Sequence, residues 1–457
     1  MKKQLSFVLI LLTATLVAVQ AQAGLKEYVA KPDPTYTYEV VESRPVDGNT
    51  MEVVRLTSQT WEGIVWKHWM AIVRPPEVAY PETAFLVIGG GSISDTPPAF
   101  GSEEGKIANL VAKSTKSVVA LLLQVPNEPL FNGLNEDEII AYTYDKYLNG
   151  EGEEWPLLLP MAKSAVRAMD TVQAVMKDKY QQEVKGFVLT GGSKRGWTTW
   201  LTAATGDPRV KAIAPVVIDV LNMREQMQHQ LDCYGSYSNQ VGDYTDLDIQ
   251  QRMDTPAGKK LLGIVDPYAY RDALTLPKLV LLGTNDPYWT VDASSLYFPD
   301  LKGEKHLYYQ ANTEHDVNAL GVATLTQFYN AAVTGKPFPK IEWKKSGKGR
   351  LDVRWSDPKG KAMLWQATSK KRDFRESEWT SEALEGDGKV SVRIKAPKKG
   401  WTAFYVEVRF PGDFGFPFGS CTEMTVLPNS YPKLKAEAAS VAKTGKGSRG
   451  RGKAGRR

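Results

Sequence analysis

Apolar and polar residues alternate in the first part of the chain. The stretches 36–41 and 66–73 are rich in β-branched and aromatic residues, and Pro75 and Pro76 end the second stretch. Alternation of this kind predicts antiparallel strands that have one face in water.

The pattern then changes to short, unbroken apolar runs with helical segments between them. Strands that are buried on both faces have this composition, so the runs predict a largely parallel sheet covered by helices. The runs are residues 85–88, 118–123, 186–189, 212–218, 279–282 and 306–309. One of the helices shows apolar residues at spacings of three and four, which is the stripe of a core-facing helix: Ala162, Ala165, Val166, Met169, Val172 and Met176.

Two stretches are too long for simple connections within this alternation. Residues 124–154 are acidic and rich in tyrosine, and residues 221–273 lie between two predicted strands. Long insertions in a fold of this kind usually form lids or binding loops. Four aromatic residues in and directly after the first insertion line a cleft or, more typically, pack against the core: Tyr142, Tyr144, Tyr147 and Trp155.

Beyond residue 338 the alternating pattern returns. Residues 350–355, 362–365, 389–394 and 402–410 alternate apolar with polar side chains, and turn residues separate them. Short strands at this spacing predict a small antiparallel, sandwich-like domain over residues 338–430. The preceding domain then covers residues 24–337.

The N-terminal 23 residues have the pattern of a secretory signal peptide. Lys2 and Lys3 precede an apolar run over residues 5–19, and Ala21 and Ala23 are small residues at the −3 and −1 positions. We expect cleavage after Ala23 and a secreted or periplasmic mature protein without a transmembrane segment. An uncleaved membrane anchor is the alternative.

Charge is distributed unevenly along the chain. The net charge of the 457 residues is +5, but the tail from Lys433 holds nine basic residues and one acidic residue. The body is therefore acidic, and residues 431–457 lack the apolar side chains that folding requires. Such a tail can contact an anionic surface polymer by charge alone, or it can be merely solvated. No specific nucleic-acid partner is indicated.

The strongest chemical signal is the string Gly191-Gly-Ser-Lys-Arg-Gly-Trp197, which lies between a predicted strand and a predicted helix. A serine nucleophile on a strained strand-to-helix turn needs small neighbours, because the two backbones approach closely there. Ser193 is therefore the candidate nucleophile. The motif is G-x-S-x-x-G rather than G-x-S-x-G, because Arg195 occupies the second small position.

Asp286 and His315 are the expected partners of Ser193. A serine hydroxyl needs a histidine to take its proton, and the histidine needs a carboxylate that fixes its tautomer. The chain order Ser, acid, His matches the α/β-hydrolase fold, and both residues follow the carboxyl ends of predicted strands. Asp292 competes with Asp286 for the role of the acid. The other histidines lie in antiparallel strands, at a strand start or in an insertion: His68, His306 and His229.

Backbone N–H groups near Ser193 are the candidate oxyanion donors. The Lys194 N–H begins the helix that follows the nucleophile. Gly90 or Gly91, directly after the run at 85–88, supplies the second donor, although a turn with positive φ explains these glycines equally well.

Cofactor signals are absent from the sequence. It contains no H-E-x-x-H zinc motif, no clustered Cys and His, no dinucleotide fingerprint and no phosphate loop. We therefore expect neither a metal nor a cofactor. Cys233 and Cys421 are too far apart in sequence to indicate whether they pair.

Three segments together resemble the PhoPQ-activated pathogenicity-related protein family of the α/β-hydrolase superfamily. They are residues 191–200, 155–161 and 283–289, and the string G-G-S-K-R-G-W is the most specific. The resemblance covers roughly residues 35–430 and implies an exported protein of α/β-hydrolase fold without a defined substrate. It also implies that the arginine after the serine belongs to the pattern.

These observations favour one function over a second. The first is a serine hydrolase that cleaves an ester or amide (peptide) bond of a small molecule or peptide, through Ser193, His315 and Asp286. The alternative is a non-catalytic envelope or cell-surface binding protein that has kept a hydrolase fold.

Overall fold

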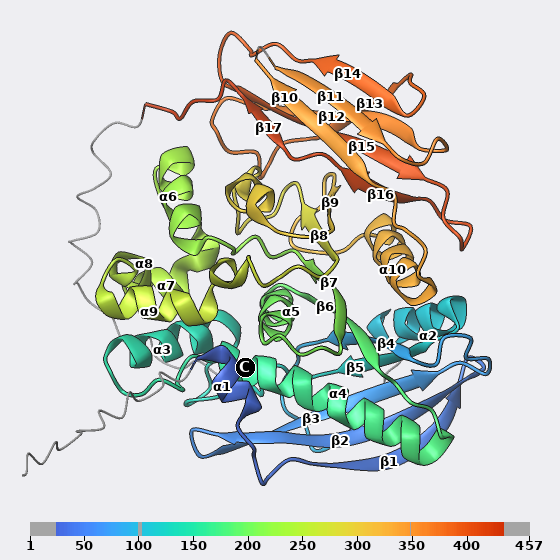
Figure 1. The fold of residues 1–457 in the computed structure, drawn as a ribbon. Coiled ribbons are helices and arrows are strands. Elements are labelled where there is room, and N and C mark those ends of the chain that lie inside the picture. Colours follow the sequence, from blue (N-terminus) through green and yellow to red (C-terminus); the bar gives the residue numbers. More distant parts are fainter. Residues whose placement is uncertain (1–23, 99–102, 348, 434–457) are drawn as a thin grey trace, which may run out of the picture.

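The computed structural model describes residues 24–98, 103–347 and 349–433 of the chain (Figure 1). The predicted signal peptide and most of the basic tail lie outside these residues. Within them, no helix is long and apolar enough to cross a bilayer.

A nine-stranded sheet forms the centre of the main domain, in the order β1-β2-β3-β5-β4-β6-β7-β8-β9. The first three strands form an antiparallel meander, and β3 pairs antiparallel with β5. The remaining strands are parallel. Their bounds are β1 Thr37–Val46, β2 Asn49–Trp61, β3 Ile64–Arg74, β4 Thr83–Ile88, β5 Val118–Leu122, β6 Gly186–Gly192, β7 Val210–Val216, β8 Lys278–Gly283 and β9 Lys305–Gln310.

Helices cover both faces of this sheet. α1 (Leu25–Ala30), α4 (Leu158–Tyr180) and α5 (Lys194–Ala204) contact one another, and α2 (Glu103–Thr115) contacts α10 (Ala319–Thr334) in a separate group. Figure 1 shows the two groups beside the sheet. This is the α/β-hydrolase fold that the sequence predicts, with an antiparallel N-terminal edge.

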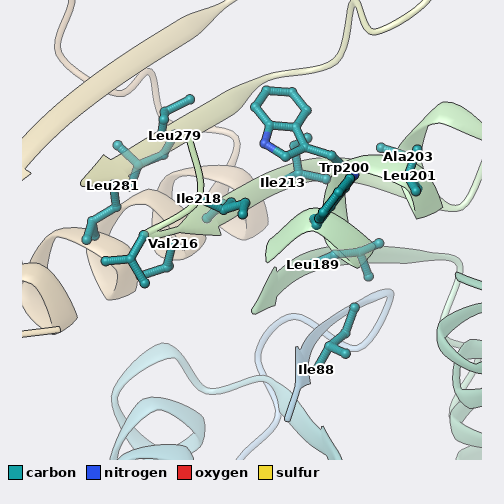
Figure 2. Close-up of a cluster of buried hydrophobic side chains, with 14 of the residues drawn as sticks. Ile88, Leu189, Trp200, Leu201, Ala203, Ile213, Val216, Ile218, Leu279 and Leu281 are labelled. Atoms are coloured by element: carbon teal, nitrogen blue, oxygen red, sulfur yellow. The ribbon is translucent and has the colours of Figure 1, made fainter. Parts of the chain in front are cut away.

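The core fills the space between the sheet and the helices. Figure 2 shows Leu189 of β6 and Ile213 of β7 near Trp200 of α5, and Leu201 of α5 and Leu279 of β8 in the same cluster. All five side chains are fully buried. The unbroken apolar runs therefore mark strands with two covered faces, as expected for parallel sheets.

Both long insertions are helical, and they pack against each other. The first contains α3 (Glu136–Leu148), which contacts three helices of the second insertion. In Figure 1 these helices form one group beside the carboxyl-end loops of the sheet. The second insertion contains α6 Met223–Tyr234, η1 Asn239–Val241, α7 Gly242–Asp246, α8 Ile249–Arg252, α9 Pro256–Val265 and η2 Pro267–Tyr270. Two short 3-10 helices, η3 Ala293–Leu296 and η4 Phe298–Asp300, lie between β8 and β9.

The C-terminal part holds two antiparallel sheets. One contains β10 Ile341–Ser346, β11 Arg350–Trp355 and β14 Lys389–Arg393, and the other contains β12 Lys361–Ser369, β13 Thr380–Leu384, β15 Trp401–Phe410, β16 Phe418–Cys421 and β17 Thr425–Leu427. Contacts between β16 and β9 join this part to the main sheet. Cys421 of β16 and Cys233 of α6 are both buried free thiols, so the chain has no disulfide between them.

Candidate active site

Ser193 occupies the turn between β6 and α5. Its backbone has φ 56° and ψ −125°, a conformation that is strained for any residue with a side chain. The Ser193 N–H donates to the Val216 carbonyl at 2.9 Å, and its carbonyl accepts from the Trp197 N–H at 3.0 Å. The turn is therefore held by β7 on one side and by the first turn of α5 on the other.

Two glycines allow the strand and the helix to approach closely. A Cβ on Gly191 would lie 2.6 Å from the Arg195 carbonyl oxygen. A Cβ on Gly196 would lie 2.7 Å from Ile218 Cγ2 and 2.9 Å from the Gly191 carbonyl oxygen. The small positions that this turn requires are thus 191 and 196, which explains the G-x-S-x-x-G spacing.

Asp286 and His315 form a hydrogen-bonded pair beyond the ends of β8 and β9. His315 Nδ1 lies 2.7 Å from Asp286 Oδ2, and the Tyr288 N–H donates to Asp286 Oδ1 at 2.9 Å. The two loops come close because β8 ends in Gly283, where a Cβ would lie 2.1 Å from the Glu314 carbonyl oxygen. Asp286 is buried, so its carboxylate holds the imidazole in one orientation.

The second ring nitrogen of His315 is not occupied by another hydrogen-bonding group of the described residues. His315 Nε2 is buried and has no hydrogen-bond partner among the described residues. The Tyr288 ring packs on the imidazole with centroids 4.5 Å apart. His315 and Ser193 line the same pocket.

Asp292, the alternative acid, lies in a different cluster. Its carboxylate lies 2.9 Å from His229 Nε2 and accepts from Arg372 at 2.8 Å. His229, Cys233 and Asp292 place their ligand atoms within 4.8 Å of one another, a spacing that suits a metal ion. However, the Arg372 guanidinium also contacts the Cys233 thiol, at 2.7 Å. A cation of the chain already neutralises this cluster, which links α6 to the C-terminal part.

Of the three residues predicted as oxyanion donors, one lines the pocket and two do not. Lys194, the first residue of α5, is one of its lining residues, whereas Gly90 and Gly91 are not among them. Gly90 instead lies against Arg195, because a Cβ there would be 2.4 Å from the guanidinium. Gly91 has φ 105°, a conformation that favours glycine. Packing and turn geometry thus account for both glycines, and their role as oxyanion donors stays a prediction.

Asp137 of α3 is a site residue that no sequence pattern indicated. Its carboxylate accepts hydrogen bonds from Lys194 Nζ at 2.8 Å, from Tyr244 at 2.9 Å and from Tyr288 at 3.3 Å. Burial disfavours the charge of Lys194, but Asp137 and Glu136 outweigh it and raise the pKa of this ammonium. The network fixes the first insertion against the loop that carries Asp286.

The pocket beside Ser193 holds about 540 Å³ of free space, including the part open to solvent. Both insertions and the loops that follow β6, β7, β8 and β9 contribute to its walls. Its lining comprises Asp137, Ser193, Lys194, Trp197, Ile218, Val220, Met223, Met227, Val241, Tyr244, Gln250, Met253, Tyr288, Trp289 and His315.

Asp219, just after β7, carries a strongly perturbed carboxyl group. Burial, together with the nearby charges of Asp286 and Asp292, raises its pKa to about 8. A carboxyl in the unfolded chain ionises near pH 4. Between pH 4 and pH 8 the unfolded chain therefore loses a proton that the folded protein keeps, and the free energy of unfolding falls by up to about 1.4 kcal/mol per pH unit.

We expect Asp219→Asn to remove this contribution. Urea unfolding at pH 5, 6 and 7 should show a shallower loss of stability in the variant than in the wild type. Asp246→Asn, at an exposed position in α7, is the matched control and should follow the wild-type curve. Parallel curves for wild type and Asp219→Asn would show that Asp219 is ionised in the folded protein.

A family model and a relative of known name match most of this chain. The family model described as PhoPQ-activated pathogenicity-related protein matches residues 25–375. Autocrine proliferation repressor protein A of Dictyostelium discoideum is 32% identical over 475 residues, which cover 94% of this chain and 95% of that protein.

Among solved structures, the acetyl xylan esterase from Paenibacillus sp. R4 has a TM-score of 0.49 at 14% identity, over 67% of this chain and 92% of that one. Acetyl xylan esterase 1 from Thermoanaerobacterium sp. JW/SL YS485 has a TM-score of 0.45 at 15% identity, over 68% and 93%.

Proposed function

The chain belongs to the PhoPQ-activated pathogenicity-related protein family, and from this premise we propose that it is an exported serine hydrolase. Its reaction is the cleavage of an ester or amide bond in a small molecule or peptide. One observation supports the proposal: His315, which Asp286 holds at 2.7 Å, has an unpartnered Nε2 among the described residues and lines the same pocket as Ser193.

The reaction begins when His315 Nε2 takes the hydroxyl proton of Ser193. Ser193 Oγ attacks the carbonyl carbon, and the Lys194 N–H, with an N–H from Gly90 or Gly91, binds the resulting oxyanion. His315 returns the proton to the leaving alcohol or amine as its bond to the carbonyl carbon breaks. Water then attacks the acyl-enzyme while His315 takes its proton, which releases the acid and restores Ser193.

The position of Ser193 supports its role as the nucleophile. It precedes α5, whose N-terminus carries partial positive charge and stabilises a nearby developing anion. The Ser193 backbone is strained, and strain of this kind is retained where a function requires it. Export rests on residues 1–23, and the basic tail remains a proposed contact for anionic surface polymers.

A fluorophosphonate probe tests the nucleophile directly. We expect the folded protein to form one covalent adduct on Ser193, located by peptide mass spectrometry, because the probe reacts with serines that a histidine activates. Urea-unfolded protein and the Ser193→Ala variant should stay unlabelled. Ser381→Ala, at an exposed position of β13, is the matched control and should label like the wild type.

Absence of labelling in the folded protein would contradict the proposal. It would favour the non-catalytic alternative, in which the fold serves binding. The name of the Dictyostelium relative, a proliferation repressor, states a biological effect and no chemistry. The labelling experiment therefore distinguishes the two functions where the relative does not.

A further inference from the structure

The pocket beside Ser193 is lined mainly by apolar side chains from the second insertion and from neighbouring strand ends. Met223 and Met227 come from α6, Val241 from η1, and Met253 follows α8. Ile218, Val220, Trp197 and Trp289 complete the apolar surface. A substrate group that leaves water for such a surface gains free energy in proportion to the apolar area it buries.

Four polar side chains of the pocket satisfy one another. Asp137 accepts from Lys194, Tyr244 and Tyr288, so these four residues bind each other at the pocket wall. Gln250 donates its amide to Thr245 outside the lining, and Gln250 Oε1 and Trp289 Nε1 have no hydrogen-bond partner among the described residues. A charged or strongly polar substrate group would have to compete with these internal bonds, whereas an apolar chain leaves them intact.

Two methionines separate this pocket from a second apolar cavity. Met223 and Met253 line both spaces, and the second cavity, between α3, α8 and α9, is small, with a volume of about 10 Å³. Its other lining includes Leu148, Ile249 and Leu261. Methionine is unbranched and changes rotamer at low cost. The two side chains can therefore adapt their shape to an apolar chain that enters the first pocket.

We propose that the substrate carries an unbranched apolar chain of roughly four to eight carbons next to the scissile bond, and that Met223, Met227 and Met253 bind it. Each methylene group that becomes buried contributes about 0.8 kcal/mol, a factor of about four in kcat/KM. This inference rests on the proposed serine hydrolase activity and adds the class of substrate.

Simple alkyl esters test the proposal, because they carry no aromatic leaving group that could fill the pocket in place of the chain. The kcat/KM of full-length protein is measured by pH-stat for methyl acetate, methyl butyrate, methyl hexanoate, methyl octanoate and hexyl acetate. Methyl hexanoate and hexyl acetate present a six-carbon chain on opposite sides of the ester. We expect at least one of the long-chain esters to exceed methyl acetate by tenfold or more.

Substitutions in the pocket test where the apolar chain of the substrate binds. Met253→Trp places a larger side chain in the wall of the pocket and should lower the ratio of long-chain to acetate kcat/KM by tenfold or more. Met227→Phe, which affects only the first pocket, is the second variant if Met253→Trp does not fold. Met363→Trp, in β12 of the C-terminal part, is the matched control and should keep the wild-type ratio.

The outcomes separate this inference from the proposed function. Highest activity on methyl acetate, or an unchanged ratio in both folded pocket variants, would overturn the inference while the hydrolase assignment stands. No turnover of any ester together with no fluorophosphonate adduct on Ser193 would overturn both.

Discussion

Replacing Ser193 by alanine should lower kcat for ester hydrolysis by about 10⁴-fold or more and leave KM nearly unchanged, because the variant loses the atom that forms the acyl-enzyme. Steady-state rates on the best ester of the chain-length series measure the effect. Ser381→Ala should retain wild-type kcat. Thermal unfolding of both variants checks that each is folded.

The effects of His315→Ala and Ser193→Ala on kcat should not be additive. Each removes the same concerted proton transfer, so the double variant should be about as slow as either single variant. Undiminished turnover in Ser193→Ala would remove this serine from the mechanism. A double variant slower by the product of the single effects would mean that Ser193 and His315 act in separate steps.

The strands that carry the site could be predicted from local sequence alone. Each parallel strand is an unbroken apolar run, and Ser193, Asp286 and His315 each follow such a run. Carboxyl ends of parallel strands meet at one edge of the sheet, so the order of runs and residues along the chain is enough to predict that the three residues lie in one region. The distance of 2.7 Å between His315 Nδ1 and Asp286 Oδ2, and the pocket that Ser193 and His315 both line, agree with that expectation.

Asp137 and the pocket methionines could not be predicted in the same way. Asp137 lies in an acidic run at the start of α3, which in sequence resembles a solvent-exposed helix end. Only the packing of α3 against α7, α8 and α9 brings it to Lys194 and Tyr288. Contacts between two insertions depend on tertiary packing, and no periodicity in either insertion encodes them.

Some C-terminal strands also escaped prediction, for a related reason. β13 is exposed along nearly its whole length and β10 on most of its positions, so neither shows a strong alternation of apolar and polar residues. β16 and β17 are only four and three residues long. Their strand conformation follows from pairing with β15, which the sequence identified by its own clear pattern.

Arg195 departs from the common nucleophile motif, and the structure gives this residue a stabilising role. Its guanidinium donates two hydrogen bonds to Glu136, at 2.9 and 2.8 Å, and another to the Val125 carbonyl. Glu128 lies 3.6 Å away. Burial disfavours the charge of Glu136, but the adjacent Arg195 and Lys194 outweigh burial and lower the pKa of this carboxyl. One buried side chain thus joins α5 to the first insertion and to the Gly90 loop.

Arg195→Leu should therefore lower the free energy of unfolding by about 2 kcal/mol, because it removes the charge-assisted hydrogen bonds to Glu136 and the bond to the Val125 carbonyl, although Lys194 stays beside Glu136. Urea unfolding measures the loss. Arg195→Lys should lie between wild type and Arg195→Leu, since a single ammonium cannot reproduce the two parallel bonds to Glu136. Arg350→Leu removes an exposed pair with Asp352 and is the matched control, for which we expect a far smaller change.

A second substitution separates the contribution of the ion pair with Glu136 from that of the other contacts of Arg195. Adding Glu136→Gln to Arg195→Leu removes the carboxylate that has lost its guanidinium partner, and the two substitutions should be less than additive because both remove the same ion pair. Strict additivity would show that Arg195 does not stabilise the charge of Glu136, which Lys194 and solvent would then compensate. In that case the arginine would stabilise the turn after Ser193 through its contacts with Gly90 and the Val125 carbonyl alone.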